Sequence, residues 1–132
     1  MEKKGKIEFW RDREKGVVDP TLFSKTAQEL AEKLAEENRK LNKRTQLRKF
    51  YDEVLRLDSE AKAKPDDWDY ILPRVHMIVA KAAYAEGREL VSKSFADFIR
   101  SSVEQVFEPK DLRVFANFFE AMMGFYQVLR TS

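Results

Sequence analysis

The chain has 132 residues, of which 43% are hydrophobic and 36% charged, with a formal net charge of +2. This length suits one domain with a buried core. The absence of cysteine excludes disulfides, thiolate metal sites and thiol nucleophiles, so we expect a cytoplasmic protein. No apolar run approaches the roughly 18 residues of a membrane span, so we expect no membrane partner. Abundant charge beside scarce Asn, Gln and Cys is typical of proteins from thermophiles.

The N-terminal segment, residues 1–17, is charged and lacks any apolar period, which predicts a flexible arm. The alternative is that its apolar side chains dock on the rest of the protein: Ile7, Phe9 and Trp10. Residues 18–132 read as one helical domain. Its first helix begins at Asp19-Pro20, an N-cap followed by proline at the first helical position, and runs to about residue 38.

Four more helices follow from apolar residues that recur at helical spacing. Their expected ranges are 45–63, 68–87, 92 or 94 to 107, and 109–129. Breakers separate them, namely Lys64-Pro65, Gly87 and Glu108-Pro109. The sequence therefore predicts an all-α, single-domain bundle of about five helices with negligible strand content.

The last of these helices is apolar most of the way round. Such a helix is either central in a bundle or shared with another protein. Because a small domain can hardly surround a helix, we predict a subunit interface and at least a dimer of the isolated chain. The predicted interface residues are Phe115, Phe118, Phe119, Met122, Phe125 and Tyr126.

Six cations gather in residues 39–49 with no acid among them: Arg39, Lys40, Lys43, Arg44, Arg48 and Lys49. This stretch carries +6 and the whole chain +2, which leaves −4 on the other 121 residues. The cations surround the predicted first turn of the second helix, with Thr45 as the expected N-cap. The helix dipole is positive there, so Asp or Glu is the usual choice. Localised positive charge indicates a specific anionic partner.

Two interpretations compete for this basic cluster. The first is a solvated face with ion pairs, because Arg48/Asp52, Lys49/Glu53 and Asp52/Arg56 lie four residues apart. The second is a phosphate site, because free amides at a helix start flanked by cations bind anions, and nucleic acid is the common polyanion. We favour the second, since the first leaves the cations before residue 45 unexplained.

A second basic stripe runs along the predicted third helix, which has no acid between residues 70 and 85. The cations that we expect to contact nucleic acid are Lys43, Arg44, Arg48, Lys49, Arg74, Lys81 and Arg88. The nearby Phe50 and Tyr51 have the spacing of core residues. We therefore expect contacts to the nucleic-acid backbone that are largely blind to base sequence.

No motif indicates an enzyme, a metal site or a cofactor. His76 is the one histidine and lies in an apolar stretch, which favours a core or interface position. A zinc site is not expected without cysteine or a second histidine. Asp66, Asp67 and Asp69 fit capping of a helix start and lack the glycine spacing of a calcium loop.

Three segments together resemble the small subunit of the type III-A CRISPR effector, the Csm complex: TQLRKFYDEV, KAAYAEGR and DLRVFANFFEAMMGFY. The resemblance covers roughly residues 20–130. It implies an all-α, non-enzymatic subunit in antiviral defence, stacked in several copies beside other Csm subunits on guide RNA and target single-stranded RNA. Thr45, Arg48 and Arg88 occupy its motif positions, whereas the other predicted RNA contacts come from charge and helical geometry.

A different class of function stays open from the residues alone. The chain could be a helical protein–protein adaptor with no nucleic-acid role. Its cationic patch would then meet an acidic protein, and the C-terminal helix would be its main interface.

Overall fold

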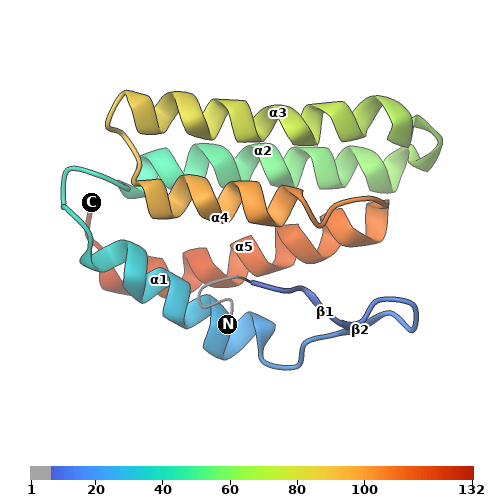
Figure 1. Ribbon diagram of the computed structural model, residues 1–132, viewed down its shortest axis with the longest axis horizontal. Coiled ribbons are helices and arrows are strands. Elements are labelled where there is room, and N and C mark those ends of the chain that lie inside the picture. Colours follow the sequence, from blue (N-terminus) through green and yellow to red (C-terminus); the bar gives the residue numbers. More distant parts are fainter. Residues whose placement is uncertain (1–6) are drawn as a thin grey trace, which may run out of the picture.

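The computed structural model describes residues 7–132 as one helical domain (Figure 1). Its elements are β1 (Trp10–Asp12), β2 (Val17–Val18), the π-helical turn η1 (Leu22–Thr26), α1 (Ala27–Glu36), α2 (Arg44–Ala63), the 3₁₀ turn η2 (Pro65–Asp67), α3 (Trp68–Gly87), α4 (Lys93–Val103) and α5 (Pro109–Leu129). The predicted all-α class with five helices is confirmed. No helix among the described residues is long and apolar enough to cross a membrane.

The predicted helix boundaries hold best where a breaker marks them. The helices expected at 45–63, 68–87 and 109–129 are observed within one residue of those limits. The first helix instead starts with a π-helical turn, and the fourth ends at Val103 rather than 107. Ser92 fixes the start of α4, since its hydroxyl accepts a hydrogen bond from the Phe95 amide at 3.2 Å.

The start of α2, the end of α3 and the C-terminus lie together at one end of the molecule. α2 and α3 form an antiparallel pair, α4 packs on α3, and α5 packs on α1 and α2 (Figure 1). The start of α2 therefore lies beside the end of α3, where the Asn42 amide donates to the Leu90 carbonyl at 3.0 Å. The C-terminus lies at the same end (Figure 1). The basic cluster is thus built into a junction of several elements.

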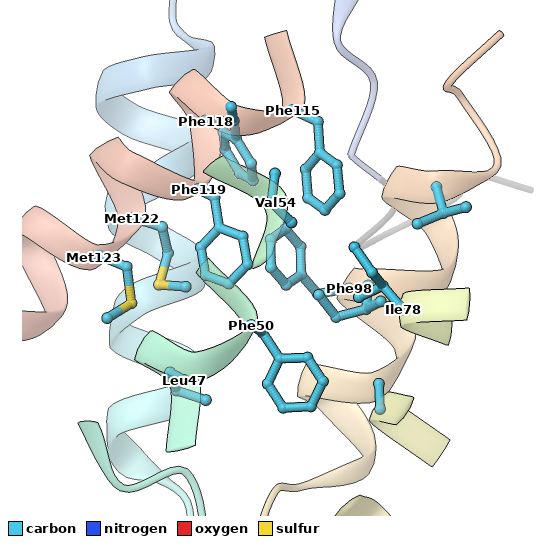
Figure 2. Packing of buried hydrophobic residues seen from close by; sticks show 14 of the residues in the cluster. Leu47, Phe50, Val54, Ile78, Phe98, Phe115, Phe118, Phe119, Met122 and Met123 are labelled. Atoms are coloured by element: carbon cyan, nitrogen blue, oxygen red, sulfur yellow. The ribbon is translucent and has the colours of Figure 1, made fainter. Parts of the chain in front are cut away.

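The aromatic face of α5 forms the centre of the core (Figure 2). Phe115, Phe118, Phe119, Met122 and Tyr126 are fully buried within the chain, and Phe125 is half-buried against the same core. Their rings pack edge-to-face and stacked, with the Phe98 and Phe119 centroids 5.2 Å apart. This corrects the predicted subunit interface, because α1, α2, α4 and the N-terminal segment together cover a helix that we expected to stay partly exposed.

Residues 7–17 also differ from the flexible arm that we expected, because they pack on the helical domain. Phe9 is fully buried, and its amide donates to Gln105 Oε1 at 2.9 Å. Gln105 Nε2 in turn donates to the Ile7 carbonyl at 2.7 Å. β1 and β2 then form a short antiparallel hairpin, the only strands within residues 7–132. Residues 1–6 of the predicted arm lie outside the described part of the chain.

Candidate nucleic-acid interface

The first turn of α2 has neither an acid nor a side-chain cap. The N-cap residue is Lys43, in an extended conformation, so the expectation that Thr45 is the N-cap is wrong. Thr45 instead lies exposed within the first turn. No side chain within residues 7–132 accepts a hydrogen bond from the amides at this helix start. The turn therefore offers N–H donors and the positive end of the helix dipole to solvent.

Asn42 holds the start of α2 in place. It is fully buried and adopts φ 60°, a left-handed conformation that Asn tolerates better than most residues. Its side-chain amide donates to Ser92 Oγ at 3.1 Å and to Glu37 Oε1 at 3.0 Å, while its Oδ1 accepts from the Ser92 amide at 2.8 Å. Its carbonyl accepts a hydrogen bond from the Tyr126 hydroxyl at 2.6 Å, and burial raises the pKa of that tyrosine.

Arg130 locks the loop that leads into this position. Its guanidinium is buried and donates to the carbonyls of Ala35, Glu37 and Leu41 at 3.0–3.2 Å. The bonds to Ala35 and Glu37 satisfy carbonyls that the end of α1 leaves without helical partners, and the bond to Leu41 holds the loop that follows. Neither Asn42 nor Arg130 was predicted as a functional residue. The only local signal is an asparagine just before a helix start.

The cations of the basic cluster have no acidic partners within residues 7–132. None of Arg39, Lys40, Lys43, Arg44, Arg48 and Lys49 forms a salt bridge there. The ion pair expected between Lys49 and Glu53 is not formed, because Glu53 pairs with Arg56 and with Lys81 at 3.7 Å. The solvated-face interpretation therefore loses the ion pairs on which it depended.

Part of the cluster surrounds a shallow pocket of about 200 Å³ between α2 and α5. Arg44, Thr45 and Arg48 line it from α2, and Met123 and Gln127 from α5. Two guanidinium groups, a hydroxyl and a carboxamide can donate hydrogen bonds to one tetrahedral oxyanion. The pocket is thus chemically suited to a phosphate group.

The predicted stripe on α3 divides into two kinds of cation. Arg74 binds Glu60 of α2 through two hydrogen bonds of 2.8 and 2.9 Å, which lower the pKa of that carboxyl, and Lys81 faces Glu53. These acids come from α2, so the absence of acids within α3 was misleading. Arg88 has no carboxylate partner among residues 7–132 and stacks on Tyr84 with 5.7 Å between its guanidinium carbon and the ring centroid.

Arg88 and the start of α2 lie at the same end of the domain. The Asn42–Leu90 hydrogen bond joins the two segments there. The structure therefore brings Arg88 toward the basic cluster and leaves Arg74 and Lys81 bound to α2 acids along the length of the helix pair.

Fold and surface together define a small all-α domain with one unneutralised basic end. Residues 18–132 match the family model Csm2 Type III-A. The chain therefore belongs to this family, the small subunit of the type III-A CRISPR Csm effector complex. This confirms the resemblance of the three sequence segments. No curated protein and no solved structure matches the chain significantly.

Proposed function

We propose that this small subunit binds the backbone of guide RNA and target single-stranded RNA through the start of α2. The residues that make the contact are Lys43, Arg44, Thr45, Arg48 and Lys49, with Arg88 beside them. One observation carries the proposal: a helix start with several cations, no capping side chain and no acidic partner within residues 7–132. A bound phosphate supplies the negative charge that the helix start lacks.

Arg74 and Lys81 have a smaller share in this proposal. Each already contacts a glutamate of α2, so RNA would gain little from them unless it displaced that acid. A surface ion pair is worth at most about 1 kcal/mol, so displacement is possible but adds little affinity. We therefore place the main contact at the end of the domain and not along α3.

The subunit has no catalytic role in this proposal. Cations that meet phosphates position RNA without reading bases, so base pairing between guide and target supplies the sequence specificity. Several copies stack along the RNA with other subunits of the Csm complex. Modest affinity at each copy then adds up through avidity.

The test is the salt dependence of binding to single-stranded RNA. Each phosphate contact contributes a slope of about −0.7 in log K against log salt. Replacing Arg44 and Arg48 by Ala removes two contacts, so the slope should flatten by roughly 1.4. Affinity should vary little among RNAs of equal length and different sequence.

A matched control is the double replacement Arg56→Ala/Lys62→Ala. It removes the same charge from the same helix, but both side chains pair with acids, Arg56 with Glu53 and Lys62 with Asp58. The control should keep most of the slope. Equal losses in both double variants would show only a net-charge effect. If the Arg44/Arg48 variant folds and binds RNA normally, and the wild type prefers an acidic polypeptide, the adaptor function replaces this proposal.

A further inference from the structure

The pocket between α2 and α5 has two walls of different chemistry. Its α2 wall is cationic, with Arg44 and Arg48 one helical turn apart and Thr45 beside them. Its α5 wall carries no charge and consists of Met123 and Gln127, which are also one turn apart. A phosphate group is bound by positive charge and hydrogen-bond donors. The α5 wall is therefore suited to a neutral part of the ligand.

The pocket is also larger than a phosphate group. Water occupies about 30 Å³ per molecule in the liquid, so five heavy atoms fill at most about 150 Å³ at that density. The pocket has a volume of about 200 Å³ and is shallow, so the ligand extends beyond the phosphate. In a nucleic acid the neighbour of every phosphate is a sugar. This sugar is uncharged, and in RNA it carries a 2′-hydroxyl.

Gln127 is the residue of the α5 wall that can recognise this hydroxyl. Its side chain is exposed and makes no hydrogen bond within residues 7–132. A carboxamide has donor and acceptor groups, and a 2′-hydroxyl is both donor and acceptor. A phosphate would use only the NH₂ group and would repel the carbonyl oxygen. We propose that Gln127 binds the 2′-hydroxyl of the nucleotide whose phosphate lies on Arg44 and Arg48, so that this pocket selects RNA over DNA.

Selection by the sugar adds a property that the cations alone do not supply. This inference rests on the RNA contact proposed for the start of α2. Lysine and arginine side chains bind the phosphates of RNA and DNA alike, because the two backbones carry the same charge. Discrimination between them requires a group that contacts the 2′ position. Gln127 is placed to do so from the opposite wall of the same pocket.

Met123 provides a surface against which the sugar packs. It belongs to the hydrophobic core (Figure 2) and is only 6% exposed, so a small part of its side chain reaches the pocket. A phosphate against this apolar side chain would lose hydration without gaining a hydrogen bond. The C–H groups of a ribose avoid that cost, and an unbranched methionine adapts to their shape. The sugar therefore lies toward α5 and the phosphate toward α2.

Hydrogen bonds beside the pocket hold its two walls together. The Tyr126 hydroxyl, from the residue before Gln127, donates to the Asn42 carbonyl at 2.6 Å. Arg44 Nη2 donates to the carbonyl of Thr131, just after the end of α5, at 3.2 Å. Walls fixed in this way reduce the ordering cost of binding. They also let a side chain of α5 reach a sugar whose phosphate is held by α2.

Acids make three larger grooves within residues 7–132 less suited to a nucleic-acid strand. Glu29 lines the groove between α1 and α4, Asp58 the groove between the end of α2 and the start of α5, and Glu104 the groove between α3 and α4. His76, which we expected in a core or interface, is exposed in the last of these. Further acids are exposed at the start of α3, where they do not cap the helix as we expected: Asp66, Asp67 and Asp69. The pocket between α2 and α5 is lined by no acid.

The test compares three single strands of one sequence that contains only A and C: RNA, DNA and 2′-fluoro RNA. The first two then carry the same bases, and the third keeps the sugar pucker of RNA without its hydroxyl. The full chain should bind RNA about three- to tenfold more tightly than either other strand, which is the value of one hydrogen bond. Gln127→Ala should bind all three strands equally. Its salt slope should equal that of the wild type, because no charge is removed.

Gln46→Ala is the matched control. It removes the same side chain from the α2 residue next to Thr45, and Gln46 does not line the pocket. This variant should keep the preference for RNA. Gln127 is exposed, so both variants should keep the wild-type melting temperature. Arg44→Ala/Arg48→Ala should weaken the binding of all three strands and flatten the salt slope.

The outcomes separate this inference from the proposed function. A wild type that binds the three strands equally, or a Gln127→Ala variant that still prefers RNA, overturns the role of Gln127. The proposed RNA contact stands in both cases if Arg44→Ala/Arg48→Ala weakens all three strands. If that double variant binds every strand as the wild type does, the proposed RNA contact fails, and the role of Gln127 fails with it.

Discussion

Two helices of this domain start in opposite ways. At the start of α5, Asp111 is fully buried and accepts hydrogen bonds from the Phe107 and Glu108 amides at 3.0 and 2.9 Å. Arg13 of the N-terminal segment then binds its carboxylate at 2.7 Å. The first turn of α2 contains no acid, no side chain of residues 7–132 caps it, and cations surround it.

The difference supports the proposal that the start of α2 binds an anionic partner. Both helices leave N–H groups without helical partners and concentrate positive potential there. The chain closes the start of α5 with its own acid and then with a basic partner from the hairpin. It leaves the start of α2 open and holds it through Asn42, Tyr126 and Arg130, which lie behind the exposed surface. The start of α5 stabilises the fold, whereas in our proposal the start of α2 binds RNA.

The largest expected effect comes from replacing Asp111, the acid that caps the start of α5. Asp111→Asn removes the charge that Arg13 and two amides bind, so we expect a loss of about 3 kcal/mol in the free energy of unfolding. Chemical denaturation measures it. Asp69→Asn is the matched control, because this acid lies exposed in the first turn of α3 and forms no salt bridge within residues 7–132. It should change stability by no more than about 0.5 kcal/mol.

The pH dependence of stability sharpens the same point. Burial alone raises the pKa of Asp111, but hydrogen bonds from Arg13, the Phe107 and Glu108 amides and Trp10 lower it below its usual value. Because folding lowers the pKa of Asp111, its ionised carboxylate stabilises the fold at pH values above about 3.9, the ordinary pKa of aspartate. This stabilisation is lost as the pH falls through the pKa of the folded state. The wild type should therefore lose stability on acidification more steeply than Asp111→Asn. Parallel acid profiles would contradict the role of this carboxylate.

The next largest effect concerns Asn42, which holds the start of α2 in place. Asn42→Gly keeps the left-handed backbone but loses the side-chain hydrogen bonds to Glu37 and Ser92, which should cost about 2 kcal/mol. Asn42→Ala should cost about 1 kcal/mol more, since a Cβ disfavours φ 60°. Thermal unfolding separates the two variants. RNA affinity should fall in both, and a normal affinity in the folded glycine variant would show that Asn42 does not position the cluster.

Local signals in the sequence predicted the helices but not the contacts between them. Glu108-Pro109 marks the start of α5, and apolar spacing gives the buried faces, whereas the first helical turn begins at Leu22 with Thr21 as its N-cap and not at Asp19-Pro20. Burial of α5 depends on how many other elements cover it, which no single helix reveals. The same holds for polar partners: Glu60 neutralises Arg74 from 14 residues away, and Arg13 reaches Asp111 across 98.

The basic cluster was predictable because it needed no partner. Six cations without an acid in residues 39–49 are visible in the sequence, and the structure adds no acid to them within the described residues. Two cations of the stripe on α3, Arg74 and Lys81, instead pair with glutamates of α2, which the sequence of α3 alone does not reveal. A charge pattern therefore predicts a free surface only when neighbouring elements bring no opposite charge.

The smallest expected effect converts the open start of α2 into a closed one. Lys43 is the N-cap residue and has the extended backbone that capping side chains require. Lys43→Asp should accept a hydrogen bond from the first turn and meet the positive helix dipole, so we expect a gain of about 1 kcal/mol in the free energy of unfolding. RNA affinity should fall at the same time, because a carboxylate would occupy the position proposed for phosphate.

Lys40→Asp is the control, because it makes the same change of charge in the loop before the helix, where no cap can form. It should weaken RNA binding without raising the melting temperature. A Lys43→Asp variant that gains stability and still binds RNA as the wild type does would separate the helix start from the RNA contact. If stability does not rise, the amides of the first turn are not available to an anion, and the phosphate site at this helix start is excluded.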